Sequence, residues 1–196
     1  RDGTRLRATV RRRDGATLEA DVLVARPPGH ETLNVIIPWS DTCFQFTSKH
    51  NTRPAQGRVV VNGTTYAFGP ENHAFGCLDY GRGIWPAVTT WNWGTAAAHV
   101  PGVGRVGLQL GGKWTDGTGS TENGFFVDGK LDKVGADLSW RYDPRDFMRP
   151  WRVDDAAGDV ALTFTPAVLR RSRIELGIAR SVLHLAFGHW SGTVRA

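Results

Sequence analysis

The residues best suited to chemistry are the carboxylates in and before a glycine-rich segment, residues 111–124, which reads GGKWTDGTGSTENG. Such a density of glycine marks backbone at positive φ or in close approach to another group, and loops between strands commonly carry the site of a β protein. Asp116 and Glu122 lie in this segment, and Asp79 precedes it. Paired carboxylates serve as general acid and base when their surroundings separate their pKa values. Asp79, Glu122 and Asp116 are therefore the candidate catalytic residues, with Asp79 or Glu122 as the proton donor.

The same carboxylates also fit structural roles. Asp116 can cap the turn at residues 115–119 by accepting hydrogen bonds from its backbone amides, and the spacing favours this role. Asp79 and Arg82 can form a bidentate ion pair at the end of a strand. For this pair the structural and the functional interpretations both stay open.

Tryptophans gather around the same region. Trp91 and Trp93 are two residues apart and project from the same face if they lie on one strand. Aromatic walls suit an apolar cavity or stacking on a sugar, although a packed core is the more common use of such side chains. Arg82 and Lys113 are suited to fixing a polar group of the ligand. The candidate ligand-binding residues are Arg82, Trp85, Trp91, Trp93, Lys113, Trp114 and Asn123.

Two phosphate-loop patterns are coincidental. Residues 102–107 (GVGRVG) match the dinucleotide fingerprint, but the alternation of residues 106–110 continues as a strand and offers no helix N-terminus. Residues 107–113 match the beginning of a P-loop, but Trp114 stands where a serine or threonine must hold magnesium. The histidines lack the spacing of metal ligands. We expect neither a metal nor another cofactor.

Composition excludes several classes of protein. The 196 residues include 24 glycines and 8 tryptophans and carry a formal charge of +5. The basic residues form no stripe with a recognisable nucleic-acid module, so we expect no nucleic-acid partner. No apolar run approaches 18 residues, so we expect no membrane span. Cys43 and Cys77 are expected to be free thiols in a cytoplasmic protein, with a single disulfide as the alternative.

The elements that must position these residues are strands. Apolar residues alternate with a period of two along most of the chain, and Asp14-Gly15, Asn62-Gly63 and Asp128-Gly129 are turn signals of hairpins. Residues 174–178 and 183–187 alternate in the same way, which predicts two strands rather than a helix. Evenly spaced short strands indicate an all-β antiparallel barrel or sandwich.

Long Trp- and Gly-rich strings resemble the bacterial family called domain of unknown function 2804. They are FGCLDYGRGIWP at residues 75–86, WNWG at 91–94 and GLQLGGKWTDGTG at 107–119, followed by TENG at 121–124. The resemblance extends through TSKHN at 47–51 and FGHWSG at 187–192. Members look longer at both ends, so this chain, which opens without a methionine, is expected to be a fragment.

That family is similar to the lipocalin-like group of carotenoid 1,2-hydratases and tocopherol cyclases. The resemblance implies a lipocalin-like (calycin-type) barrel or two-lobed barrel, with residues 1–70 as the remainder of an N-terminal lobe and 71–196 as a truncated C-terminal lobe. It also implies cofactor-free hydratase, isomerase or cyclase chemistry. Asn92 stands where the hydratases carry an acid, which argues against their own mechanism.

The leading hypothesis is a protein that binds an apolar or amphipathic small molecule, with acid–base activity if it is an enzyme. The alternatives are a carbohydrate-active or glycan-binding β-sandwich and a non-catalytic binding barrel.

Overall fold

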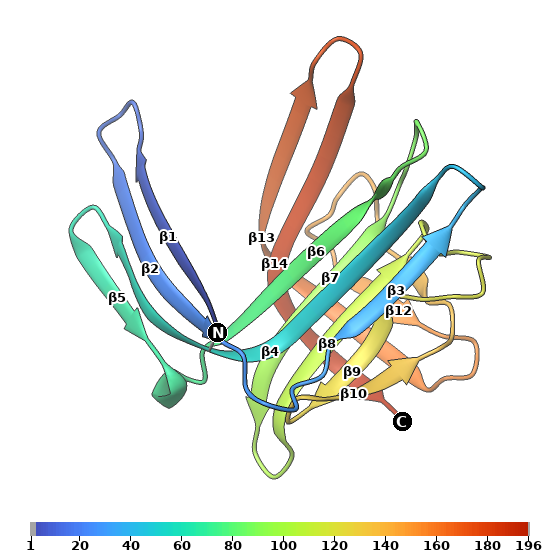
Figure 1. Cartoon of the computed structure of the whole chain (residues 1–196), viewed down its shortest axis with the longest axis horizontal. Helices are drawn as coiled ribbons and strands as arrows, with labels where there is room; N and C mark the ends of the chain where they lie inside the picture. Colours follow the sequence, from blue (N-terminus) through green and yellow to red (C-terminus); the bar gives the residue numbers. More distant parts are fainter. Residues whose placement is uncertain (1–2, 196) are drawn as a thin grey trace. The chain divides into compact units, whose positions relative to one another are not determined.

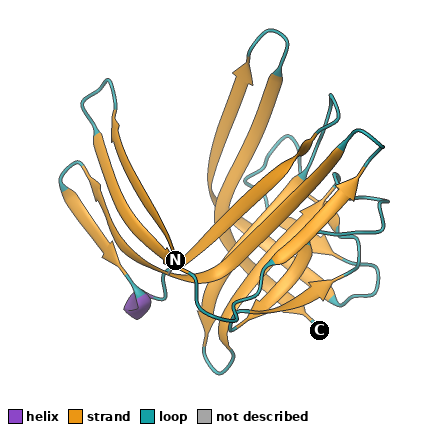
Figure 2. Ribbon diagram, viewed as in Figure 1, coloured by secondary structure: helices purple, strands orange, loops and turns teal. Residues whose placement is uncertain are grey.

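The computed structural model describes residues 3–195 as strands, turns and loops with a single short 3-10 helix, η1 (Pro70–Asn72) (Figures 1 and 2). The chain divides into two compact units, Arg1–Gly135 and Ala136–Ala196. Within the described residues, no helix is long and apolar enough to span a membrane.

The first unit begins with a sheet that is organised around one long strand. Its strands are β1 (Gly3–Arg11), β2 (Thr17–Ala25), β3 (Leu33–Pro38), β4 (Phe44–Val61), β5 (Thr64–Phe68) and β6 (Phe75–Ile84). The first part of β4 pairs with β3 and β6, and its last part pairs with β2 and β5, all antiparallel. Figure 1 shows β4 running through both parts of the sheet.

A β-bulge interrupts β4 between these two parts. His50 lies opposite Leu78 of β6 and Arg53 lies opposite Gly76, so the register shifts by one residue. Thr52, within the bulge, has a φ of 52°, a left-handed conformation that costs a β-branched residue about 1–2 kcal/mol. Because their partners are two residues apart on β6, His50 and Arg53 face the same side of the sheet.

The second sheet of this unit has the order β10-β9-β8-β7. Its strands are β7 (Asn92–Val100), β8 (Gly104–Gly112), β9 (Asn123–Val127) and β10 (Lys130–Val134). It packs on the first sheet through β4, where Asn51 Nδ2 donates to the Leu108 carbonyl at 2.7 Å. The fully buried side chains Leu33, Ile37 and Phe126 form the apolar part of this interior.

The second unit is one antiparallel sheet with its own core. Its strands are β11 (Ser139–Arg141), β12 (Trp151–Asp154), β13 (Val160–Glu175) and β14 (Arg180–Val194). Val153, Val160 and Phe164 are buried, and the Phe164 ring lies 5.0 Å from that of Trp190. The two long strands β13 and β14 form a hairpin. The predicted strand at residues 183–187 lies within β14, but of the one predicted at 174–178 only residues 174 and 175 belong to β13, because residues 176–179 form the turn.

The all-β antiparallel class is confirmed, and so are the three predicted hairpins, which are β1/β2, β4/β5 and β9/β10. None of the three sheets closes into a barrel over the described residues, so the barrel stays a prediction. The lobe boundary expected at residues 70 and 71 also stays a prediction, and in the structure this point lies in η1 within the first unit. Cys43 and Cys77 are free thiols.

Candidate active site

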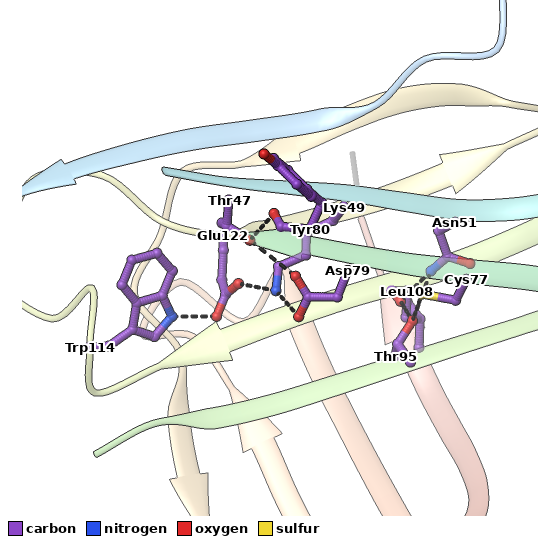
Figure 3. Close-up of polar contacts among 10 residues, drawn as sticks. All are labelled: Thr47, Lys49, Asn51, Cys77, Asp79, Tyr80, Thr95, Leu108, Trp114 and Glu122. Carbon is purple, nitrogen blue, oxygen red and sulfur yellow. Dashed lines mark hydrogen bonds and ion pairs between the residues drawn. The ribbon is translucent and has the colours of Figure 1, made fainter. Parts of the chain in front are cut away.

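Lys49 joins two of the predicted carboxylates. Its Nζ lies 2.6 Å from Asp79 Oδ2 and 3.1 Å from Glu122 Oε2, the second contact being an ion pair without hydrogen-bond alignment (Figure 3). The side chains of Lys49 and Glu122 are 5% and 1% exposed, whereas that of Asp79 is 44% exposed. Of the three side chains, Asp79 is therefore in contact with solvent, whereas Lys49 and Glu122 are buried.

The strands position these groups from opposite sides. Lys49 on β4 lies directly opposite Asp79 on β6, a cross-strand arrangement in which opposite charges attract. Thr47 Oγ1 donates to the other carboxylate oxygen of Asp79 at 3.2 Å. Glu122 immediately precedes β9, and its side chain lies against Gly111 of β8, where an added Cβ would collide with Glu122 Cγ.

Burial changes the chemistry of Glu122. Its pKa is raised because removal from water disfavours the carboxylate, and this effect exceeds the opposing influence of Lys49. The Trp114 indole N–H donates to Glu122 Oε1. Glu122 is thus a carboxyl group with a raised pKa beside an aromatic ring, which is the environment of a general acid.

An aromatic cluster of Trp39, Trp85, Trp91 and Trp114 extends from this carboxyl group. Trp85 is the centre, with ring centroids 5.4 Å from Trp39, 6.1 Å from Trp114 and 6.4 Å from Trp91. The Trp39 indole donates to the Trp114 carbonyl at 3.1 Å. Trp85 and Trp91 are exposed, so the cluster runs from the surface to the Trp114 ring that contacts Glu122.

Two buried polar groups near the charges have no hydrogen-bond partner among residues 3–195. They are the side-chain amide of Gln109, whose residue is 0% exposed, and the indole N–H of Trp93. Lys49 Nζ lies 5.5 Å from the centroid of the Trp93 ring, a cation–π distance. Buried polar groups normally carry hydrogen bonds, so these two have hydrogen-bonding capacity that the described residues do not use.

A second polar group of residues lies beyond Lys49 along the same interior. Asn51 Nδ2 donates to Thr95 Oγ1 at 3.1 Å, and Cys77 Sγ lies 3.5 Å from the same hydroxyl (Figure 3). Cys77 is an exposed residue, but partial removal of its thiol from water raises the pKa of that thiol. The hydrogen bond from Asn51 of β4 to Thr95 of β7 joins the two sheets.

Some of the predicted site residues lie close to Lys49 and Glu122 in the structure, and others do not. Asp79, Glu122, Trp93 and Trp114 lie around Lys49, while Trp85 and Trp91 contact them through the aromatic cluster. Asp116 is exposed and accepts a hydrogen bond from the backbone N–H of Lys113 at 2.7 Å, a structural role whose donor precedes the predicted turn at residues 115–119. Asn123 Oδ1 accepts from the Gly111 backbone N–H at 2.7 Å, so it braces the glycine-rich segment.

Asp79 and Arg82 do not form the ion pair that the sequence allowed. The two residues are three positions apart on β6 and therefore project from opposite faces, and Arg82 is exposed opposite Phe46. Asp79 pairs with Lys49 instead. Lys113 has a φ of 70° and an exposed side chain at the turn.

Sequence reasoning missed three contributors, Lys49, Gln109 and Trp39. The signal for the first is a run of polar residues at alternate positions of β4, Gln45, Thr47, Lys49 and Asn51, all of them buried. Gln109 likewise alternates with the apolar residues Leu108 and Leu110. Such polar residues at inward positions of a strand indicate a polar interior, whereas nothing in the sequence singles out Trp39.

A buried carboxyl group with a raised pKa is chemically suited to proton transfer. Among residues 3–195 no group of three or more His, Cys, Asp and Glu side chains could hold a metal ion.

No curated protein and no solved structure matches this chain. The family model described as "Domain of unknown function (DUF2804)" matches residues 1–196, the whole sequence. The tryptophan, glycine and acidic residues of the site lie within this match, and the chain belongs to the DUF2804 family.

Proposed function

We propose that the protein binds an amphipathic small molecule beside the aromatic cluster and that Glu122 exchanges a proton with it, without a cofactor. The observation that carries this proposal is the position of Glu122, which is 1% exposed and lies between the Trp114 indole and Lys49. Exposed Trp85 and Trp91 supply an apolar surface for the ligand. Gln109 and Trp93 supply buried hydrogen-bonding groups for its polar end.

Glu122, Lys49 and Asp79 have different roles in this proposed reaction. Glu122, with its raised pKa, donates the proton. Lys49 stabilises the carboxylate that remains, and Asp79 holds Lys49 in place from the solvent side. The tryptophan faces stabilise a cation that develops on the ligand. This chemistry is of the hydratase, isomerase or cyclase type.

A lipocalin-like architecture is part of the same proposal. Antiparallel strands in sequence order, such as β7 to β10, and two sheets that enclose polar inward residues support it.

A matched pair of variants tests the role of Glu122. Glu122→Gln removes the acid but keeps an oxygen for the Trp114 indole, and Asp116→Asn makes the same change of charge in the same loop. Native mass spectrometry of the wild-type protein, followed by denaturation, identifies a co-purifying molecule. Tryptophan quenching by an isoprenoid alcohol, a fatty acid and a gluco-oligosaccharide then measures binding. We expect Glu122→Gln to bind but not to convert the retained ligand, while Asp116→Asn does both.

Equal conversion by wild type and Glu122→Gln would refute the acid role. Binding by wild type without any conversion would leave a non-catalytic binding protein.

Glycan binding is the second candidate, favoured by the exposure of Trp85 and Trp91. Exposed tryptophans stack on sugar faces. A glycosidase needs the glycosidic bond between its two carboxylates, but Lys49 Nζ contacts both Asp79 and Glu122 and lies between them. The arrangement therefore favours glycan binding without hydrolysis. Quenching by the oligosaccharide but not by the isoprenoid or fatty acid would establish this function instead.

A further inference from the structure

A group of basic and hydroxyl side chains lies on the face of β4 opposite to Lys49. We call it the basic cluster, and its members are Arg26, His30, Thr32, Ser48, His50 and Arg53. The bulge of β4 creates it, because the extra residue brings His50 and Arg53 to the same face. Arg26 follows the end of β2, and His30 and Thr32 belong to the segment that leads into β3.

Arg53 is the central observation. It is 6% exposed, its Nε has no hydrogen-bond partner, and no carboxylate forms an ion pair with it among residues 3–195. A buried charge without a partner is costly, because the energy of its hydration is lost and not replaced. Arginine is nearly always charged and presents its donors in a fork that matches the oxygens of phosphate.

The neighbours of Arg53 are positive or neutral. Burial, and then Arg53, Arg26 and His30, lower the pKa of His50 to about 4, so that His50 is a neutral imidazole near pH 7. The pKa of Arg53 is lowered by burial and by Arg26. Glu31 is the acid next to His30 in the sequence, but it binds Lys130 at 3.1 Å and the Leu131 backbone N–H at 2.7 Å.

Hydroxyl groups complete the surroundings. Thr32 Oγ1 lies 3.2 Å from His50 Nδ1, and Ser48 Oγ lies 3.2 Å from His50 Nε2. These groups can rotate to donate to an oxygen of a bound anion. His30 Nε2 donates to the Asn51 carbonyl at 2.8 Å and so ties the cluster to the bulge.

We propose that the basic cluster binds a phosphate group, with the Arg53 and Arg26 guanidinium groups as its principal donors. Two arginines with adjacent hydroxyls offer donors in several directions, which suits a tetrahedral oxyanion. The site lies on the other face of β4 from Lys49 and is independent of the function proposed above.

Titration of the wild-type protein with inorganic phosphate, at constant ionic strength in chloride, tests this proposal. Calorimetry measures the affinity, and NMR follows the His50 ring. We expect saturable binding, a rise in the pKa of His50, and a loss of affinity of at least tenfold in Arg53→Gln and in Arg26→Gln. The matched control is Arg58→Gln, an exposed arginine of the same strand, which retains the wild-type affinity.

Arg26 is exposed, so Arg26→Gln is expected to fold even where Arg53→Gln does not. A parallel titration with glycerol 1-phosphate distinguishes free phosphate from a phosphate ester. Tighter binding of the ester identifies a phosphorylated metabolite as the ligand, and tighter binding of inorganic phosphate identifies the free ion. No saturable binding of either compound, or equal affinity in wild type, Arg53→Gln and Arg26→Gln, would overturn the proposal.

Discussion

Lys49 lies between the two carboxyl groups of the candidate active site. Its ammonium contacts both Asp79 and Glu122, yet the two differ sharply in contact with water. Solvent reaches Asp79, whereas Glu122 is enclosed and has a raised pKa because burial outweighs the attraction to Lys49. One lysine thus contacts an exposed carboxylate, Asp79, and a buried carboxyl group, Glu122.

The raised pKa of Glu122 predicts a loss of stability as pH rises. The unfolded chain releases this proton near pH 4.5, before the folded protein does, so the free energy of unfolding falls from pH 4.5 upward through the raised pKa. Glu122→Gln should lack this decline. Urea unfolding at a series of pH values, with Asp116→Asn as the control, measures it, and parallel pH profiles for wild type and Glu122→Gln would contradict it.

The lowered pKa of His50 predicts that the free energy of unfolding changes with pH in the opposite direction in acidic solution. Its pKa is lowered from 6.5 to about 4, so the unfolded chain binds this proton first and the free energy of unfolding falls as pH decreases from 6.5 to about 4. His50→Gln should flatten the profile in this window. The exposed His189 provides the control His189→Gln, and an unchanged acidic slope in His50→Gln would refute the assignment.

Two strands, β4 and β8, position the buried charged and polar side chains of the first unit. One face of β4 presents Lys49 to the candidate active site. His50 points to the other face by strand alternation, and the bulge turns Arg53 to that face as well. On β8, glycines make room for side chains of other segments, since a Cβ at Gly107 would meet Thr52 and Asn51 and one at Gly111 would meet Glu122. The interior between the two sheets thereby accommodates buried charged and polar groups.

The close approach at Gly111 predicts that Gly111→Ala destabilises the protein. The added methyl group collides with Glu122 Cγ, and overpacking of this kind costs about 1–3 kcal/mol. Gly135→Ala is the matched control, because no atom lies within 4 Å of its added Cβ, and its effect should stay within about 0.5 kcal/mol. Thermal and urea unfolding measure both variants, and equal stability of the two would show that Glu122 moves aside freely.

The whole molecule consists of two units with separate cores. Phe126 of β9 is fully buried in the first unit, at the position opposite Gly107 of β8. Its replacement by alanine leaves a large void.

We therefore expect Phe126→Ala to lower the free energy of unfolding by about 3–5 kcal/mol. Phe187→Ala removes an exposed ring and should change it by less than about 1 kcal/mol. Denaturant unfolding compares the two variants, and a similar loss in both would contradict the assignment of Phe126 to the core.

Local patterns in the sequence determine the strands, the hairpin turns and the general place of the site. Alternation and Asx-Gly turns act between neighbouring residues, so they can be recognised without knowledge of the fold. The glycine-rich segment likewise identifies Glu122 as a candidate. The opposite projection of Asp79 and Arg82 follows from strand geometry alone, once both are assigned to one strand.

Only the tertiary structure decides which of these groups meet. Lys49, Asp79 and Glu122 come from β4, β6 and the segment before β9, and their contact depends on the register between strands and the stacking of two sheets. A one-residue shift in register would turn Lys49 to the other face, as the bulge does for Arg53. The pKa of Glu122 depends in turn on burial by distant segments, which no local pattern specifies.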